Sequence, residues 1–336
     1  MAPDPIISVP EIQVLLNLLK RPVEIKYPLY DFDIMTLRDT ASGFVLSGMC
    51  TREDFEEASG AFGEFAHDMP SYNDVLQSML ASGIIAYPNM EKFNDIKKNI
   101  PLMNKEVLFS LDTNMLYHAF PSQGGIPAAH YLLVDIVQAE IESALNTKYS
   151  PHTINQMKRM APFEGALLEE LVNQKTKRSR IAAYTALAEF EKIRGQARII
   201  PGVEPGGPDK EKNDLIIVKS LRDYEKDAFG TMVHLTADAN VAELCRAEGI
   251  AYHLFEFPHA IDVRECTPSG AVNLISHLAV AFGVVKCGSA FIYGEYRGKG
   301  AKKQSLKVVI RNPDLAEEFE RELTLCRKLQ DLPIHE

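Results

Sequence analysis

The sequence predicts an α/β fold in which a largely parallel sheet occupies the middle of the chain. Short apolar runs at 106–111 and 130–138 have the length of buried strands. Helical patterns follow them over 153–197 and 240–249. Strands that alternate with helices in this way are typical of parallel sheets, whose functional sites form at the carboxyl ends of the strands.

The first hundred residues are expected to form a separate α/β domain, 1–103. Helical spacing at 14–19 is followed by β-like runs over 34–49, and further helices are expected from Thr51 and over 73–82. No residue pattern in this part carries a chemical signature, so we expect a structural or regulatory role.

The middle part, 104–258, contains the parallel-sheet domain. Its first strand ends on Asp112, and the second apolar run leads into the helical stretch AEIESAL, which places Glu140 in a first helical turn. A Pro/Gly-rich segment precedes the remaining elements, which are an apolar run at 215–218, a strand at 231–235, a helix at 240–249 and a strand at 250–257.

The last part, 259–336, reads as a small α-β-β-α module, so α+β in character. The expected elements are a helix at 272–284, strands at 290–296 and 306–311, and a helix at 313–329. A glycine-bearing basic turn, YRGKGAKK, separates the two strands.

Composition places the chain among globular proteins, because 46% of its 336 residues are hydrophobic and 24% are charged. The net charge of −10 is unevenly distributed. Basic residues outnumber acidic ones by nine to five over 151–200 and by six to one over 294–312. Local binding of a polyanion is therefore compatible with the acidic whole.

Cysteine and histidine spacing exclude several classes of site. Five cysteines without a CxxC pair suggest reduced, mostly buried thiols. The nine histidines show no HxH or HExxH spacing, which disfavours a zinc hydrolase. No apolar stretch is long enough to span a bilayer and no signal segment is recognisable, so we expect a cytoplasmic protein without a membrane partner.

Acidic residues follow the predicted strands, as Asp112 and Asp238 do. Hydrolysis of a phosphodiester requires neutralisation of charge on the phosphorus oxygens and a nucleophile near neutral pH, and bound Mg²⁺ or Mn²⁺ can supply both. These cations prefer carboxylate oxygens. Such a hydrolase therefore needs several acids, from distant parts of the chain, at one end of the sheet.

Four segments, LDTNMLYHAF, AEIESAL, NDLIIVKSL and HLTADANVAELCRAEGIAYHLF, resemble the successive motifs of the PIN domain family. The first acid of that family matches Asp112, which is followed by Thr-Asn. Its second matches Glu140, its third matches Asp214, and its fourth, in a T-x-D motif, matches Asp238 after Thr236. The resemblance covers roughly 150 residues.

The resemblance implies a Rossmann-like parallel sheet and a metal-dependent endoribonuclease. Asp112, Glu140, Asp214 and Asp238 would be both catalytic residues and ligands of Mg²⁺ or Mn²⁺. It further implies single-stranded RNA as the partner and, because PIN domains often dimerise, a homodimer.

The third motif departs from the family pattern. Lys219 and Ser220 stand where the family often has alanine, and the segment between Glu140 and Asp214 is longer than in compact members. Asp223 and Asp227 therefore remain alternatives to Asp214. If Asp214 fits, the run after it begins a helix, which a short apolar run by itself leaves open.

Polar residues near the predicted site each have two interpretations. Asn114 and Thr236 could orient carboxylates or serve in turns and caps, and Asn240 is expected to cap a helix, although it could also touch a metal-bound water. Asp135 is better explained as a structural acid or a misplaced strand end. Core or surface roles are favoured for His118 and His234.

Two basic groups are candidates for RNA contact. The first could instead be a solvated helix face; it consists of Lys175, Lys177, Arg178 and Arg180. The second lies at the basic turn, where charge could also keep a sheet edge soluble; it consists of Arg297, Lys299, Lys302 and Lys303.

The sequence thus predicts a metal-dependent ribonuclease that hydrolyses RNA through a four-carboxylate cluster, in RNA processing or quality control. The main alternative is a PIN-derived RNA-binding or assembly scaffold with weak or no activity. A small-molecule phosphohydrolase or nucleotide-binding protein is a third hypothesis, and it would require a deep enclosed pocket.

Overall fold

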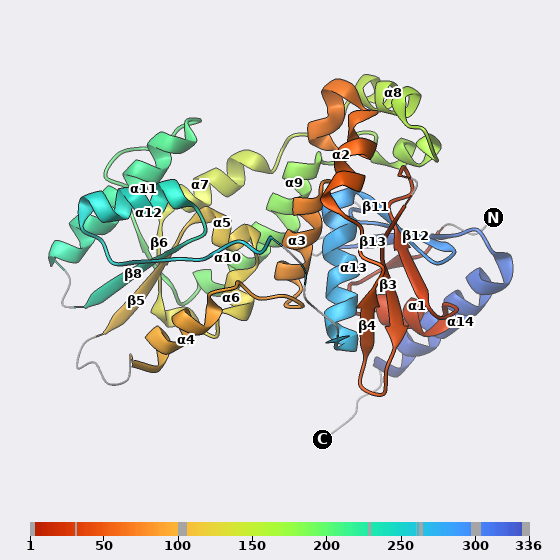
Figure 1. Ribbon diagram of the computed structural model, residues 1–336, viewed down its shortest axis with the longest axis horizontal. Coiled ribbons are helices and arrows are strands. Elements are labelled where there is room, and N and C mark those ends of the chain that lie inside the picture. Colours follow the sequence, from red (N-terminus) through yellow and green to blue (C-terminus); the bar gives the residue numbers. More distant parts are fainter. Residues whose placement is uncertain are drawn as a thin grey trace. The chain divides into compact units, whose positions relative to one another are not determined.

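The chain folds into two units (Figure 1). The computed structural model describes residues 4–30, 32–99, 106–227, 230–259, 261, 265–296 and 304–330. Unit 1 consists of Met1–Ile84, Lys148–Arg180 and Asp262–Glu336, and unit 2 of Ile85–Thr147 and Ile181–Ile261. The pattern predicts three parts, 1–103, 104–258 and 259–336. In the structure the first and last parts share one sheet, so they belong to the same unit.

Unit 2 is built on a five-stranded parallel sheet of order β7-β6-β5-β8-β9. Its strands are β5 (Val107–Leu111), β6 (Tyr131–Val134), β7 (Arg198–Ile200), β8 (Thr231–Thr236) and β9 (Tyr252–Leu254). Every residue of β5 and β6 is buried, as is usual for central strands covered on both faces. The expected α/β fold with a parallel sheet is confirmed, and the sheet is compatible with a Rossmann-like core.

Helices flank this sheet, with α11 and α12 on one face and α4, α6 and α10 on the other (Figure 1). The helices of unit 2 are α4 (Met90–Asn99), α5 (Thr113–Tyr117), α6 (Phe120–Gln123), η3 (Ala128–His130), α7 (Asp135–Ala144), the π-helical η5 (Ala182–Ala186), α10 (Leu187–Arg194), α11 (Lys210–Asp227) and α12 (Ala239–Glu248). Gly249 ends α12 with a φ of 72°, a conformation that glycine adopts without a Cβ clash.

The second strand ends earlier than predicted, at Val134. Asp135 therefore begins α7, and Glu140 lies in the second turn of that helix and not in the first. The apolar run at 130–138 contains both the strand and the helix start, and periodicity cannot separate them within so short a run. The run at 215–218 lies inside α11, as the PIN resemblance implies, and the last strand is shorter than expected.

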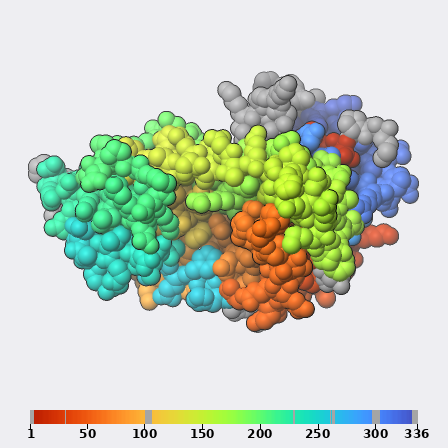
Figure 2. Space-filling model, turned by 90° about the horizontal axis from the view of Figure 1, so that it is seen from above, coloured from red at the N-terminus to blue at the C-terminus, as the bar shows by residue number. Residues whose placement is uncertain are grey.

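The long interval between Glu140 and Asp214 has a structural explanation. Its first half leaves unit 2: α8 (Pro151–Met160), η4 (Gly165–Leu171) and most of α9 (Lys177–Ile181) belong to unit 1. In the views of Figures 1 and 2, α8 lies beside the segment that contains η1 (Gly63–Asp68) of the same unit. The interval between Glu140 and Asp214 is therefore long because it contains the segment Lys148–Arg180, which belongs to unit 1.

Unit 1 contains an eight-stranded antiparallel sheet of order β1-β13-β12-β11-β2-β3-β4-β10. Its strands are β1 (Ile6–Ile7), β2 (Val23–Lys26), β3 (Asp33–Asp39), β4 (Phe44–Ser47), β10 (Glu265–Cys266), β11 (Val284–Cys287), β12 (Ala290–Tyr293) and β13 (Leu306–Ile310). Strands from both ends of the chain alternate in this order. Neither terminal segment therefore forms the sheet by itself.

The remaining helices of unit 1 are α1 (Ile12–Leu18), α2 (Arg52–Gly60), α3 (Tyr72–Ala81), α13 (Pro268–Phe282) and α14 (Pro313–Gln330). Thr51 and Ser71 begin α2 and α3 with capping boxes, so local sequence specifies both starts. The C-terminal module contains two strands that the sequence pattern did not predict, β10 and β11. Gly283, with a φ of 83°, ends α13, and the apolar residues after it continue as β11.

Two general expectations from the sequence concern the cysteines and a membrane-spanning helix. The five cysteines are free thiols, and Cys50, Cys245 and Cys287 are buried, as predicted. In the described part of the chain, no helix combines the length and apolarity needed to cross a bilayer.

Candidate functional site

In the sheet of unit 2, the strand order reverses between β5 and β8. The first acidic motif follows β5 and the fourth follows β8. Asp112 comes directly after β5, and Asp238 comes two residues after β8. In open parallel sheets, ligands bind at the carboxyl ends of the strands at such a reversal point. The first and fourth predicted acids therefore stand where this fold places its sites.

Thr236 connects these two acids. Its Oγ1 donates a hydrogen bond of 2.8 Å to Oδ2 of Asp112 and accepts one of 2.9 Å from the backbone N–H of Asp238. Asn114 adds a side-chain hydrogen bond of 3.2 Å to the same Oδ2. Both Asn114 and Thr236 therefore orient the Asp112 carboxylate, and Thr236 also accepts a backbone N–H two residues on, as in a turn. The cap of α5 is Asp112 and neither of these two residues.

Burial is the main influence on Asp112, which is 2% exposed. Loss of hydration raises the pKa of Asp112 above its usual value, and the hydrogen bond from Thr236 only partly opposes this rise. Asp238 is more accessible. Burial by itself would raise the pKa of Asp238, but the hydrogen bonds from Lys210 and from the backbone N–H of Asn240 hold it below its usual value.

Asp238, and not Asn240, caps α12. The carboxylate of Asp238 accepts the Asn240 backbone N–H at 2.9 Å, whereas the side chain of Asn240 is exposed. The expectation that Asn240 supplies the cap is therefore wrong. The helix begins at Ala239, one residue before the predicted start, and its cap lies two residues before the predicted one, within the usual uncertainty of helix ends.

Glu140 reaches the site from the second turn of α7. One oxygen, Oε1, accepts a hydrogen bond of 2.9 Å from Nδ2 of Asn213, and the other accepts one from Oγ1 of Thr113. Thr113 follows Asp112 and Asn213 precedes Asp214. The second acid is thus connected through neighbouring residues to the first and third.

Asp214 lies in the first turns of α11 and is 6% exposed. Burial raises the pKa of Asp214 from its usual 3.8 to about 7, and the negative charge of Asp112 adds to the shift. Glu140 and Asp238 act in the same direction, while Lys210 opposes them. All four predicted acids are therefore close enough to influence one another electrostatically.

Asp223 and Asp227, the alternatives to Asp214, lie further along α11. The side chain of Asp223 is 58% exposed and forms an ion pair of 2.7 Å with Lys226 one turn later. Asp227 is exposed at the end of the helix. Neither contributes to the pKa shift of Asp214 among its largest causes. The third acid of the group is Asp214.

Lys210 supplies a positive charge to this group of acids. Its Nζ lies 3.1 Å from Oδ2 of Asp238. Burial would lower the pKa of Lys210, but the hydrogen bond to Asp238 and the charges of Asp214 and Asp112 raise it. Lys210, Asn213 and Thr113 were missed as site residues. Their adjacency to predicted acids or to the start of the acid-bearing helix was the only available signal.

The donor set is of the kind that hard divalent cations prefer, since it offers carboxylate oxygens in a partly dehydrated place. Burial, and after it the negative charge of Asp112, raises the pKa of Asp214, and a bound cation would offset both effects. As arranged here, however, the described residues contain no group of three or more Asp, Glu, His or Cys side chains positioned to hold a metal ion. Lys210 already neutralises part of the charge.

The other predicted polar residues have structural partners. Asp135 accepts the backbone N–H of Gly202 at 2.9 Å. His118 lies 2.8 Å from the Tyr87 hydroxyl through Nδ1, and His234 lies 3.1 Å from Oγ of Ser110. Burial lowers the pKa of each histidine to about 4, so both are neutral near pH 7. These contacts agree with the structural interpretation favoured for all three.

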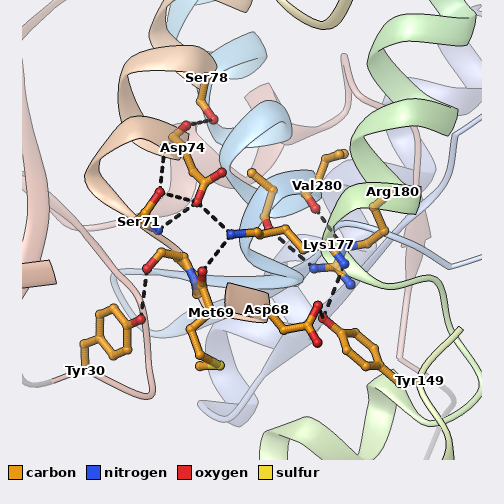
Figure 3. Close-up of polar contacts among 12 residues, drawn as sticks. Tyr30, Asp68, Met69, Ser71, Asp74, Ser78, Tyr149, Lys177, Arg180 and Val280 are labelled. Atoms are coloured by element: carbon orange, nitrogen blue, oxygen red, sulfur yellow. Dashed lines mark hydrogen bonds and ion pairs between the residues drawn. The ribbon is translucent and has the colours of Figure 1, made fainter. Parts of the chain in front are cut away.

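The first group of candidate RNA-binding residues lies in unit 1, and most of it makes internal contacts (Figure 3). Nζ of Lys177 contacts the carbonyl of Met69 and the carboxylate of Asp74, and Arg180 is 1% exposed. Lys175 pairs with the buried Glu295. Neither a phosphate-binding patch nor a solvated helix face describes these three side chains; Arg178 alone of the group is exposed.

The second group falls outside the described residues. It comprises Arg297, Lys299, Lys302 and Lys303. Contact of this basic turn with RNA stays a prediction.

Comparison with known proteins gives no further assignment. No family model matches the chain, and no curated protein matches it.

Proposed function

We propose that unit 2 is a metal-dependent ribonuclease in which Asp112, Glu140, Asp214 and Asp238 hold Mg²⁺ or Mn²⁺. The observation that carries this proposal is the gathering of four acids, from four separate chain segments, at the reversal point of a parallel sheet. Asp112, Glu140 and Asp238 each add to the rise that burial causes in the pKa of Asp214, which agrees with this gathering. The order of these acids along the chain, together with their local motifs, carries the sequence resemblance to the PIN domain family on which the proposal also draws.

A bound divalent cation would offset the phosphodiester charge and activate a water molecule. The chain itself would position the acids. Thr236 and Asn114 orient Asp112, and Thr113 and Asn213 orient Glu140. Hydrogen bonds of this kind fix the direction of ligand oxygens before a ligand arrives. RNA, in single-stranded form, is the proposed substrate, and RNA processing or quality control is the proposed setting.

The direct test is cleavage of labelled single-stranded RNA and DNA with Mn²⁺, Mg²⁺ or EDTA, using the wild type, Asp112→Asn and Asp238→Asn. We expect metal-dependent cleavage of RNA by the wild type and a loss of at least about 100-fold in each variant. Equal activity in the variants and the wild type would refute the carboxylate mechanism. Circular dichroism of each variant controls for unfolding.

One observation favours a second candidate, an RNA-binding or assembly scaffold derived from the same fold. The ion pair between Lys210 and Asp238 shows that part of the site charge is neutralised without a metal. The scaffold would bind RNA in the presence of EDTA and leave it intact under every metal condition. The same labelled RNA, followed by a gel-shift measurement, separates the two candidates.

A further inference from the structure

Lys210 lies between two of the site acids, Asp214 and Asp238. It is the first residue of α11, one helical turn before Asp214, and its ammonium lies 3.1 Å from Asp238 at the start of α12. Residues four apart on a helix lie on the same face. The lysine therefore lies on the same face of α11 as Asp214 and forms an ion pair with Asp238, the cap of α12.

Hydrogen bonds of Asn213 and Asp209 fix the backbone on both sides of Lys210. Asn213 is 3% exposed and uses its side chain to accept the N–H of Gly207 and to donate to the carbonyl of the same residue, both at 2.9 Å. Asp209 accepts the backbone N–H of Lys212 at 3.2 Å. These bonds fix the chain on both sides of Lys210, so the side chain extends from a defined point.

An ammonium group and a divalent cation would both bind the carboxylate of Asp238. Both seek its carboxylate oxygens, and each raises the electrostatic cost of placing the other nearby. The ammonium cannot diffuse away, because it is covalently tethered. Its side chain is nevertheless 57% exposed, which leaves room for it to swing into solvent.

We propose that Lys210 is a tethered cation that competes with the metal for Asp238 and thereby weakens metal binding at the site. This inference rests on the function proposed above. With no metal bound, the lysine stabilises the acids and limits their repulsion. When a divalent cation binds, the ammonium gives up its place on Asp238. The residue thus sets the metal concentration at which the site is filled.

The experiment measures Mn²⁺ binding by isothermal titration calorimetry, with no RNA present. The proteins are the full-length wild type, Lys210→Met, Lys210→Arg and Lys212→Met. Lys212 is the matched control: it lies two residues away in the same helical turn, is 59% exposed, and pairs only loosely, at 3.7 Å, with Glu204. Its removal deletes the same charge without freeing a site carboxylate.

We expect Lys210→Met to lower the dissociation constant for Mn²⁺ on the order of tenfold, the lower end of the range in which residues beside metal ligands alter affinity. Lys210→Arg keeps the charge and should remain close to the wild type, as should Lys212→Met. An unchanged or weaker affinity in Lys210→Met would overturn the proposal. Equal tightening in Lys212→Met would also overturn it, because the effect would then be one of general charge.

The result separates this inference from the proposed ribonuclease function. Tighter Mn²⁺ binding by Lys210→Met in a protein that cleaves no RNA would support the lysine's role and reject the nuclease. RNA cleavage by the wild type, together with the same Mn²⁺ affinity in the wild type and Lys210→Met, would support the nuclease and reject the role of the lysine. Absence of Mn²⁺ binding in all four proteins would reject both. Asp112→Asn shows whether the heat measured comes from this site, since it should abolish that binding.

Discussion

The side-chain amide of Asn213 donates a hydrogen bond of 2.9 Å to Oε1 of Glu140, joining α11 to α7. The same amide nitrogen also donates to the carbonyl of Gly207, so both of its hydrogens are used. Nearby, Gly206 packs closely against the same two helices, because a Cβ there would lie 3.2 Å from Ile136 of α7 and 3.4 Å from Oδ1 of Asn213. The Gly/Pro-rich segment before α11 is thereby tied to the acid that α7 contributes.

Replacement of Asn213 by alanine should disorient Glu140. We expect Mn²⁺ affinity to fall by about 10- to 100-fold, the usual range when a residue that orients a metal ligand is removed. Calorimetric titration of the folded variant measures this. Asn240→Ala is the matched control, because Asn240 gives Asp238 only a backbone N–H, which alanine retains. Equal affinities in the two variants would contradict the positioning role.

Stability in EDTA should depend on pH through Asp214. Its pKa is about 7 in the folded protein against a usual value of 3.8, so the folded state binds the proton more tightly. The protonated carboxyl group therefore favours folding below pH 4, and this contribution is lost as pH rises toward 7. We expect Asp214→Asn, which does not titrate, to gain stability relative to the wild type as pH rises from about 4 to about 7.

Urea unfolding at several pH values measures that difference. Its magnitude should level off above about pH 7, where the Asp214 carboxyl group has lost its proton in both states. Asp223→Asn, which removes a carboxylate from the exposed part of the same helix, is the matched control. A difference between Asp214→Asn and wild type that is constant with pH would show that the carboxyl group is not perturbed.

In unit 1, Lys177 joins α9 to the start of α3 (Figure 3). It donates to the carbonyl of Met69 at 2.8 Å and to Asp74 at 3.2 Å, with both side chains largely buried. Lys177→Met should lower the free energy of unfolding by about 1–3 kcal/mol, because a buried carboxylate loses a charged partner. Urea denaturation measures it. Arg178→Met, at the exposed neighbouring position, should have almost no effect.

A double-mutant cycle isolates the Lys177–Asp74 pair from the other bonds. Asp74 also accepts the backbone N–H and hydroxyl of Ser71, both at 2.7 Å, so Asp74→Asn disturbs a capping box as well. The coupling energy between the two substitutions removes that contribution. Strict additivity would mean that the ion pair has no net effect on stability.

Among Lys175, Lys177, Arg178 and Arg180, we expect Arg180 to be the least tolerant of replacement. Its Nε donates to the carbonyl of Val280 at 2.7 Å and its Nη1 to that of Lys175 at 2.7 Å. Val280 lies in the last turn of α13, where a positive charge is favoured. Arg180→Lys keeps the charge but loses the fork of donors, and we expect a loss of about 2–4 kcal/mol in the free energy of unfolding.

Thermal and urea unfolding of Arg180→Lys test this expectation. Lys175→Arg, which keeps a partner for Glu295 and also conserves charge, is the control and should change stability much less. A stable Arg180→Lys protein would show that the guanidinium geometry is dispensable. The RNA affinity of Arg178→Ala then tests the one exposed member of this group by itself.

The sequence by itself determined the local features of this protein. Apolar runs specified β5 and β8, and each is followed by one of the predicted site acids, Asp112 or Asp238. Capping boxes at Thr51 and Ser71 specified the starts of α2 and α3. These features depend on neighbouring residues, so periodicity and residue type suffice to predict them.

The tertiary structure decided everything that depends on distant residues. Pairing of Ile6 with Lys307 joins the two ends of the chain in one sheet, and no local pattern contains that information. The ion pair of Lys210 with Asp238 and the burial of Arg180 have the same origin. Such contacts form only after the chain has paid the entropy of bringing remote segments together, so their partners follow from the fold and not from spacing.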